Sequence, residues 1–181
     1  LRAGVDSIEH GSFLDAETAD LFVATGAYLV PTLIAGHTVE RIATEQPDFY
    51  VPEVRQKAIE VGPIMKTALR TAYEKGVKIA FGTDAGVNDH GTNAYEAVLM
   101  NEAGMPERAI LISATINAAE LIGITDITGT IEVGKDADII AVGGNPLEDI
   151  STLLQPSYVM VRGNEVDLDV PPVNLFPWPD I

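Results

Sequence analysis

The sequence contains no cysteine. Disulfide bonds, thiolate metal sites and cysteine nucleophiles are therefore excluded. The absence of cysteine does not indicate whether the protein works in an oxidising or a reducing compartment. Long apolar runs are also missing, because glycine, proline or charged residues interrupt each run well before the ~20 residues that a membrane-spanning helix needs. We therefore expect a soluble protein and assign it to the cytoplasm, leaving open a signal peptide upstream of Leu1.

Basic residues are scarce. Lysine and arginine number 11 against 27 acidic residues, which gives a formal net charge of −16. Such a surface repels phosphate backbones and anionic lipids, so we expect no nucleic-acid partner and no membrane partner. We interpret the acidity mainly as a source of solubility. With 46% hydrophobic residues in 181, the chain has enough apolar material to bury a core.

The chain has no initiator methionine, and residues 1–4 are typical of the end of a helix, with Gly4 just past it. We therefore expect the sequence to be part of a longer one. Three short apolar segments are predicted strands and two longer periodic segments are predicted helices, in alternation. In chain order these are strand 5–10, helix 15–26, strand 27–34, helix 52–75 and strand 77–83. Alternation of this kind predicts an α/β fold with a parallel sheet.

The segment 35–52 contains glycine, histidine, two prolines and mixed charge, so we predict a loop over a site. Two further helices are predicted at 93–103 and 106–121. Beyond Thr128, segments 130–142 and 158–166 are predicted strands of a small β layer. We therefore expect three parts, which are residues 1–127, residues 128–170 and a proline-rich tail at 171–181.

Only three histidines occur, and the position of His10 is informative because it ends a predicted strand. Asp84 follows another predicted strand. Side chains at the carboxyl ends of parallel barrel strands converge on one site, and an imidazole with a carboxylate suits Zn²⁺ and similar cations. Each residue taken alone has a simpler interpretation. A His-Gly pair is often a hydrogen-bonded structural histidine, and Thr-Asp-Ala-Gly is often a helix entry capped by aspartate.

The order of the motifs weakens these simpler interpretations. The chain runs through Ile-Glu-His-Gly at 8–11, Val-Pro-Thr at 30–32, Phe-Gly-Thr-Asp-Ala-Gly at 81–86, His-Gly-Thr-Asn-Ala-Tyr-Glu at 90–96, Ala-Thr-Ile-Asn-Ala-Ala-Glu-Leu-Ile-Gly at 114–123, Gly-Thr-Ile-Glu-Val-Gly-Lys-Asp-Ala-Asp-Ile-Ile at 129–140 and Asn-Pro-Leu-Glu-Asp-Ile at 145–150. This series resembles the C-terminal half of the amidohydrolase superfamily, in particular the branch of Xaa-Pro dipeptidases and imidazolonepropionase-like enzymes.

The resemblance implies the C-terminal part of a TIM-type (β/α)8 barrel with part of a small β-sandwich domain. His10 would end the sixth barrel strand, 27–34 would be the seventh strand, and Asp84 would end the eighth. His10 and Asp84 would then be ligands of one or two divalent metal ions, for which Zn²⁺ is the expectation. The His-x-His pair, the lysine and the further histidine of the family are not in this sequence. We therefore expect the rest of the barrel to supply them, and the 181 residues alone to be inactive and poorly stable.

The resemblance also implies a reaction, the hydrolysis of a C–N bond by metal-activated hydroxide, with Asp84 as the catalytic general base. A dipeptide or an N-acyl amino acid is the expected substrate, ahead of a cyclic amide or an amidine. A metal-free structural or binding barrel is the remaining alternative, although such a relative has no chemical need for both His10 and Asp84.

The remaining site predictions concern groups around the mouth of the site. His90 and Asn93 follow the eighth strand and are predicted to bind substrate, with a loop cap as the alternative. Thr32 ends the seventh strand and is predicted to hydrogen-bond ligand or neighbours. His37 is expected to be solvated or part of a lid. The predicted partners are a small-molecule or dipeptide substrate and the remainder of the barrel, and a homo-oligomer is compatible with these features.

Overall fold

The structure is a computed structural model and describes residues 1–169; the predicted tail at 171–181 lies outside the described residues. The first part of the chain alternates strands and helices: β1 (Ser7–Glu9), α1 (Ala16–Thr25), β2 (Tyr28–Val30), α2 (Leu33–Glu45), α3 (Pro52–Glu74) and β3 (Lys78–Ile79). The second part begins with α4 (Tyr95–Glu102), α5 (Glu107–Ile112), a π-helical segment (Ser113–Asn117) and α6 (Ala118–Leu121). It ends with β4 (Ile139–Val142), a 3-10 helix (Ile150–Leu154), β5 (Pro156–Val161) and β6 (Asn164–Glu165).

The first three strands form a parallel sheet in the order β1-β2-β3. The prediction of an α/β fold with a parallel sheet is therefore confirmed. Because parallel strands point the same way, their carboxyl ends lie at one edge of the sheet. The strands are shorter than predicted. β2 stops at Val30, because Pro31 offers no N–H to the ladder and α2 begins at Leu33.

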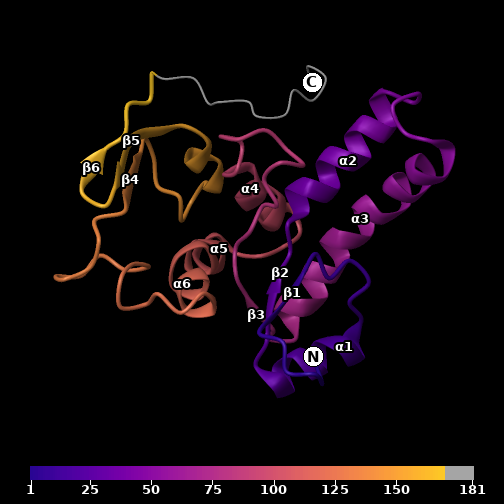
Figure 1. The fold of residues 1–181 in the computed structure, drawn as a ribbon, viewed down its shortest axis with the longest axis horizontal. Coiled ribbons are helices and arrows are strands. Elements are labelled where there is room, and N and C mark those ends of the chain that lie inside the picture. The colour runs from indigo at the N-terminus through magenta and orange to yellow at the C-terminus, as the bar shows by residue number, and fades with distance from the viewer. Residues whose placement is uncertain (170–181) are drawn as a thin grey trace.

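The predicted loop at 35–52 is wrong, because α2 occupies most of it. Apolar side chains recur at helical spacing in this segment, and Ile34, Thr38 and Ile42 are all buried. The chain then turns over residues 46–51, and α3 packs back along α2 to form a helical hairpin (Figure 1). Mixed charge and prolines concealed this periodicity in the sequence.

Helix α1 follows its sequence signals closely. Asp15 is the N-cap and accepts a hydrogen bond from the Thr18 N–H at 2.8 Å, and Gly26 ends the helix with a φ of 74°. Helix α3 begins at Pro52, a residue that suits the first turn because its missing N–H has no partner there anyway. The predictions of these two helices are confirmed.

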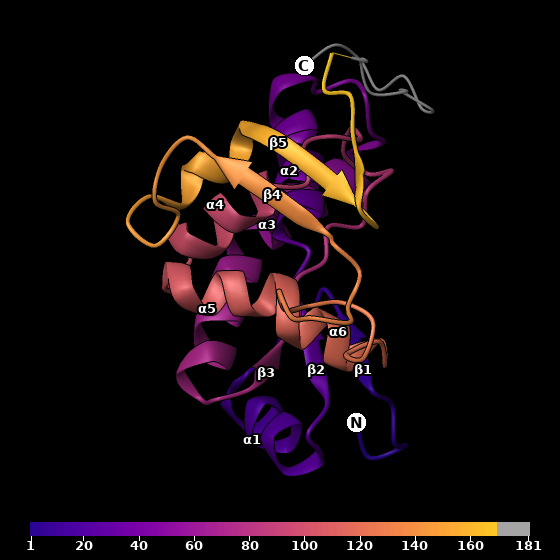
Figure 2. The same ribbon diagram turned by 90° about the vertical axis from the view of Figure 1, so that its left-hand side faces the viewer.

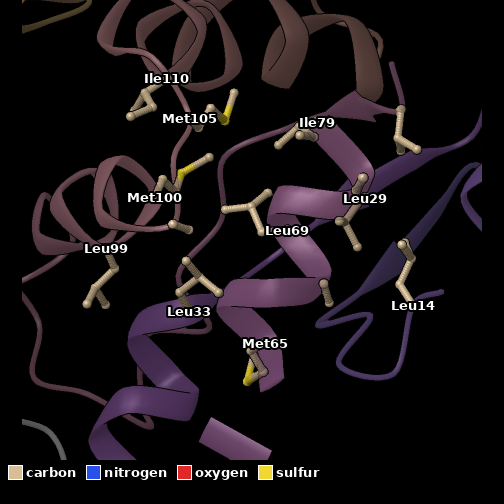
Figure 3. Close-up of a cluster of buried hydrophobic side chains, with 14 of the residues drawn as sticks. Leu14, Leu29, Leu33, Met65, Leu69, Ile79, Leu99, Met100, Met105 and Ile110 are labelled. Atoms are coloured by element: carbon tan, nitrogen blue, oxygen red, sulfur yellow. The ribbon is translucent and has the colours of Figure 1, made fainter. Parts of the chain in front are cut away.

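One hydrophobic core joins the parallel sheet to the helices. In Figure 3, Leu69 of α3 lies between Leu29 of β2 and Met100 of α4, and Ile110 of α5 belongs to the same cluster. Leu69 is 1% exposed and Ile110 0% exposed. Full burial of such a side chain contributes about 1.5–3 kcal/mol, so this cluster fixes the helices against the sheet.

The predicted single helix at 106–121 is divided into α5, the π-helical segment and α6. The division has a local physical reason. The Ser113 carbonyl accepts a hydrogen bond from the Phe81 N–H at 3.0 Å, and Asn117 Nδ2 donates to the Ile79 carbonyl at 2.8 Å. The wider π turn lets the helix bond to the end of β3 and so supports the segment that leads to Asp84.

The last three strands form a second, antiparallel sheet in the order β4-β5-β6. The predicted strand at 130–142 is only partly correct, because regular pairing is confined to β4. Helices α5 and α6 lie between the two sheets in both ribbon views (Figure 1, Figure 2). Within residues 1–169, no helix combines the length and the apolar character that crossing a bilayer requires.

Candidate active site

Three residues that follow strands of the parallel sheet have left-handed backbone conformations. The φ angles are 65° for His10, 47° for Thr32 and 52° for Asp84. None of the three is glycine, and a non-glycine residue in this region carries strain of about 1–3 kcal/mol. Such strain persists only where the surrounding structure enforces it, and it clusters at active sites. The carboxyl edge of this sheet is therefore the candidate active site.

A cavity of about 250 Å³ lies between this edge and the α2–α3 hairpin. His10 and Asp84 both line it, so the structure brings the two predicted ligands to one cavity wall. The rest of the wall is mostly apolar and is contributed by Ser12, Ala35, Gly36, Val39, Ala58, Val61, Gly62, Met65 and Val87. Both side chains are exposed in the described part of the chain. Their roles as metal ligands stay predictions.

The orientation of His10 leaves one ring nitrogen available. Its Nδ1 lies 2.5 Å from the hydroxyl oxygen of Thr32, which is 2% exposed. When Nδ1 carries the proton and donates it to this oxygen, the lone pair on Nε2 is free for a cation. Thr32 therefore binds a neighbour in this structure, which is one of the two roles that the sequence suggested for it.

The donor chemistry at this edge fits a divalent metal ion, although the set is partial. An imidazole nitrogen and a carboxylate oxygen are ordinary ligands of Zn²⁺, and a catalytic site of this metal has three protein ligands. Residues 1–169 contain no cluster of three or more histidine, aspartate or glutamate side chains that could hold a metal. His10 and Asp84 therefore need at least one further ligand.

Glu96, on α4, is a functional candidate that the sequence prediction missed. Its side chain is fully buried and accepts hydrogen bonds from the Leu33 N–H at 2.9 Å and the Ile34 N–H at 2.6 Å. Burial raises the pKa of the Glu96 carboxyl to about 7, and the two N–H groups lower it in part. The sequence does contain a signal for this residue, because Glu96 is a carboxylate on a short helix next to the apolar residues Ala97, Leu99 and Met100, all of which are buried.

The structure does not bring His90 and Asn93 to the cavity that His10 and Asp84 line. His90 is exposed and is not part of its wall. Asn93 is occupied within its own loop, because its Nδ2 donates to the Thr83 hydroxyl at 3.0 Å and its oxygen accepts from the Gly91 N–H at 3.3 Å. The predicted substrate contacts of both residues stay predictions, and the loop-cap alternative describes the observed bonds of Asn93.

His37 lies on α2 rather than in a loop, and it lines a second cavity of about 460 Å³ together with Arg41, Asn88, Asp89 and Tyr95. Its ring packs against Tyr95 with the ring centres 5.6 Å apart. Burial lowers the pKa of His37, and the charges of Lys66 and Arg41 lower it further. The predicted loop position of His37 is therefore wrong, while a solvated or lid position stays a prediction, since the side chain is only part-buried.

Parallel strands whose carboxyl ends carry an imidazole and a carboxylate beside one cavity are typical of α/β enzymes with sites built from strand ends. Comparison with known protein families supports this class and identifies the family. The Amidohydrolase family model matches residues 1–166, which is most of the chain. The chain therefore belongs to the Amidohydrolase family, as the order of its motifs suggested.

Similar proteins with known structures or names agree with this assignment. A Xaa-Pro dipeptidase with methionine bound in its active site is 51% identical with a TM-score of 0.87, over 92% of this chain and 41% of the other. A prolidase complexed with N-methylphosphonate-L-proline is 33% identical with a TM-score of 0.80, over 91% and 41%. Ochratoxinase of Aspergillus niger is 32% identical over 161 residues, which are 88% of this chain and 32% of that protein. The chain thus spans about a third to two fifths of the length of these relatives.

Proposed function

We propose that this chain forms the C-terminal part of a metal-dependent hydrolase that cleaves the C–N bond of a dipeptide or an N-acyl amino acid. The observation that carries the proposal is the shared cavity of His10 and Asp84 at the carboxyl ends of parallel strands. The similarity to a Xaa-Pro dipeptidase at 51% identity supports a dipeptide substrate ahead of the alternatives.

In this proposal, His10 would hold a divalent metal ion through Nε2, and Asp84 would hold it through its carboxylate. Such an ion, for which Zn²⁺ is the expected identity, polarises the scissile carbonyl and makes water more acidic. One ion or two are equally compatible with the residues of this chain. The hydrogen bond that His10 Nδ1–H donates to the Thr32 hydroxyl oxygen fixes the plane of the His10 ring, so Nε2 keeps a constant direction.

The second carboxylate oxygen of Asp84 is the proposed general base. It accepts a proton from the attacking water and then delivers this proton to the leaving nitrogen, which makes the amine a better leaving group. Asp84 suits this task because it is held at the cavity wall by a constrained backbone and forms no ion pair with a cationic side chain of residues 1–169.

The remaining ligands would come from the rest of a (β/α)8 barrel, placed N-terminal to Leu1. An eight-stranded barrel takes about 250 residues, and this chain contributes three parallel strands. Exposure of both His10 and Asp84 is consistent with this arrangement, because the missing strands would cover them. The same segment would complete the small β domain to which β4, β5 and β6 belong.

A hydrolysis screen of the full-length protein tests the proposal. Xaa-Pro, Xaa-Arg and other dipeptides are incubated with the protein and added Zn²⁺, and free amino acids are quantified. We expect turnover of at least one dipeptide class, abolished by a chelator and restored by Zn²⁺. Absence of Zn²⁺ binding together with absence of hydrolysis would overturn the proposal in favour of a metal-free binding barrel.

A further inference from the structure

The N-terminus of α2 is capped in an unusual way. The first N–H groups of a helix have no partner within the helix, and a threonine at the N-cap ordinarily accepts one of them through its side chain. Thr32 is the N-cap of α2, but its side chain makes no such bond. The carboxylate of Glu96, 63 positions beyond Leu33, accepts the Leu33 and Ile34 N–H groups instead.

This exchange of partners frees the Thr32 hydroxyl for another task. Its oxygen lies 2.5 Å from Nδ1 of His10, which follows β1. If Thr32 capped its own helix in the ordinary way, its side chain would have to turn toward the helix N–H groups and away from the imidazole. Thr32 also has a left-handed φ of 47° in place of the extended backbone of an ordinary N-cap, so its side chain is not placed to cap α2 and another group accepts the first N–H groups.

Glu96 is well placed to hold this arrangement rigidly. Its neighbours on α4, Leu99 and Met100, are both 0% exposed and belong to the main core. Helices α2 and α4 are also in direct contact. A carboxylate fixed by core packing on one helix therefore sets the position of the first turn of the other.

We propose that Glu96 is a positioning residue for His10, acting through the first turn of α2 and the Thr32 hydroxyl. The inference rests on the proposed function, because it gives His10 the task of holding a metal ion. Glu96 itself touches neither the cavity nor the proposed substrate. Glu96 on α4 binds the first turn of α2, which begins just after Thr32, and Thr32 in turn contacts His10.

The competing interpretation is that Glu96 is a helix cap and nothing more. The loss of a cap costs about 0.5–2 kcal/mol of stability wherever it occurs. A cap without a positioning role would therefore lower the melting temperature and leave the His10 ring and the affinity for a metal unchanged. Readouts at His10 itself separate the two interpretations.

The first experiment observes His10 directly. The full-length protein, labelled with ¹⁵N-histidine and freed of metal, is compared with Glu96→Gln, which keeps the size of the side chain and removes its charge. Glu102→Gln is the matched control, because Glu102 lies at the other end of α4, is 49% exposed and pairs with Lys66. We expect the hydrogen-bonded Nδ1–H signal of His10 to shift or broaden in Glu96→Gln and to stay in place in Glu102→Gln.

An unchanged His10 signal in Glu96→Gln would overturn the inference. If Glu96→Gln fails to fold, Glu96→Asp replaces it, because this variant keeps the charge and shortens the reach of the carboxylate by one methylene. A shifted or broadened His10 signal is again expected, and an unchanged signal would again contradict the inference.

The second experiment measures Zn²⁺ affinity by competition with a chelator, again in the full-length protein. Groups that orient a metal ligand typically change metal affinity by 10–100-fold, so we expect a loss in this range for Glu96→Gln and for Thr32→Ala. Thr32→Ser, which retains the hydroxyl, should keep most of the affinity. The loss of Zn²⁺ affinity in the double variant Glu96→Gln/Thr32→Ala should not exceed the larger of the two single losses, because both residues act on one path. Additive losses would show independent effects and would contradict the proposal.

The two experiments distinguish failure of this inference from failure of the proposed function. A wild-type protein that binds no Zn²⁺ removes the proposed function. The metal-free His10 signal still decides whether Glu96 positions the ring. Conversely, Zn²⁺ binding that is insensitive to Glu96 keeps the proposed function and removes the positioning role.

Discussion

Nδ1 of His10 and the hydroxyl oxygen of Thr32 lie 2.5 Å apart, although 22 positions separate the two residues. The contact crosses from the end of β1 to the end of β2, which are neighbouring parallel strands. It leaves Nε2 open when Nδ1 carries the ring proton, and it does so through Thr32, for which the sequence predicted a hydrogen bond to ligand or neighbours. The following predictions examine this edge of the sheet.

Asp84→Asn should lower turnover by about 10²–10⁴-fold, the range for loss of a general acid–base group, because an amide oxygen is a poor proton acceptor. Steady-state kinetics of the full-length protein with its best dipeptide measures the effect. Asp126→Asn is the control, since it makes the same chemical change at an exposed position away from the cavity. Near-normal turnover in Asp84→Asn would remove this residue from the mechanism.

His10→Ala should lower the metal content of the purified protein, because alanine has no donor to replace the imidazole nitrogen. His90→Ala should leave the metal content unchanged, since His90 does not line the cavity. Elemental analysis of both variants after dialysis decides between them. Equal metal loss in the two variants, or none in His10→Ala, would contradict the assignment of His10 as a ligand. A raised KM in His90→Ala would support its predicted substrate contact.

The free energy of unfolding should fall as pH rises from about 4.5 to about 7 through the titration of Glu96. Its carboxyl has a pKa of about 7 in the folded chain against 4.5 for the free group, so between these values the folded state binds the extra proton. The stabilisation is complete below pH 4.5 and lost above about 7, and it amounts to on the order of 3 kcal/mol.

Urea unfolding at several pH values, in wild type and Glu96→Gln, isolates this contribution as the difference between two curves. The variant has no group to titrate at position 96, so its curve should be flatter over this interval. Parallel curves would show that burial does not raise the pKa of Glu96.

Gly82→Ala should destabilise the protein by about 1–3 kcal/mol, because the added Cβ would overlap a methyl group of Val30 and force the strand ends apart. Gly143→Ala is the matched control, since an added Cβ there meets no atom within 4 Å. Thermal unfolding of the two variants measures the difference. Because Gly82 is two residues from Asp84, turnover in Gly82→Ala should fall as well. Equal stability of the two variants would disprove the overlap.

Much of the fold was readable from the sequence because its signals are local. Asp15 and Gly26 mark the ends of α1, and Pro52 marks the start of α3, through bonds and backbone angles within a few residues. The membership in the Amidohydrolase family was readable from the ordered motifs, and residues 1–166 confirm it. The segment at 35–52 was not readable in this way. Its charges and prolines resemble those of a loop, and only packing against α3 shows that its apolar positions share one face.

The sequence by itself determined the chemistry on offer, an imidazole and a carboxylate that each follow a strand, because residue type and position after a strand are properties of short segments. Only the tertiary structure decided that both line one cavity, that Thr32 serves His10, and that Glu96 serves α2. The physical reason is that these features join residues from 22 positions apart, for Thr32 and His10, to 74 positions apart, for His10 and Asp84. Their geometry depends on how the strands and helices pack, and no local pattern of residues records it.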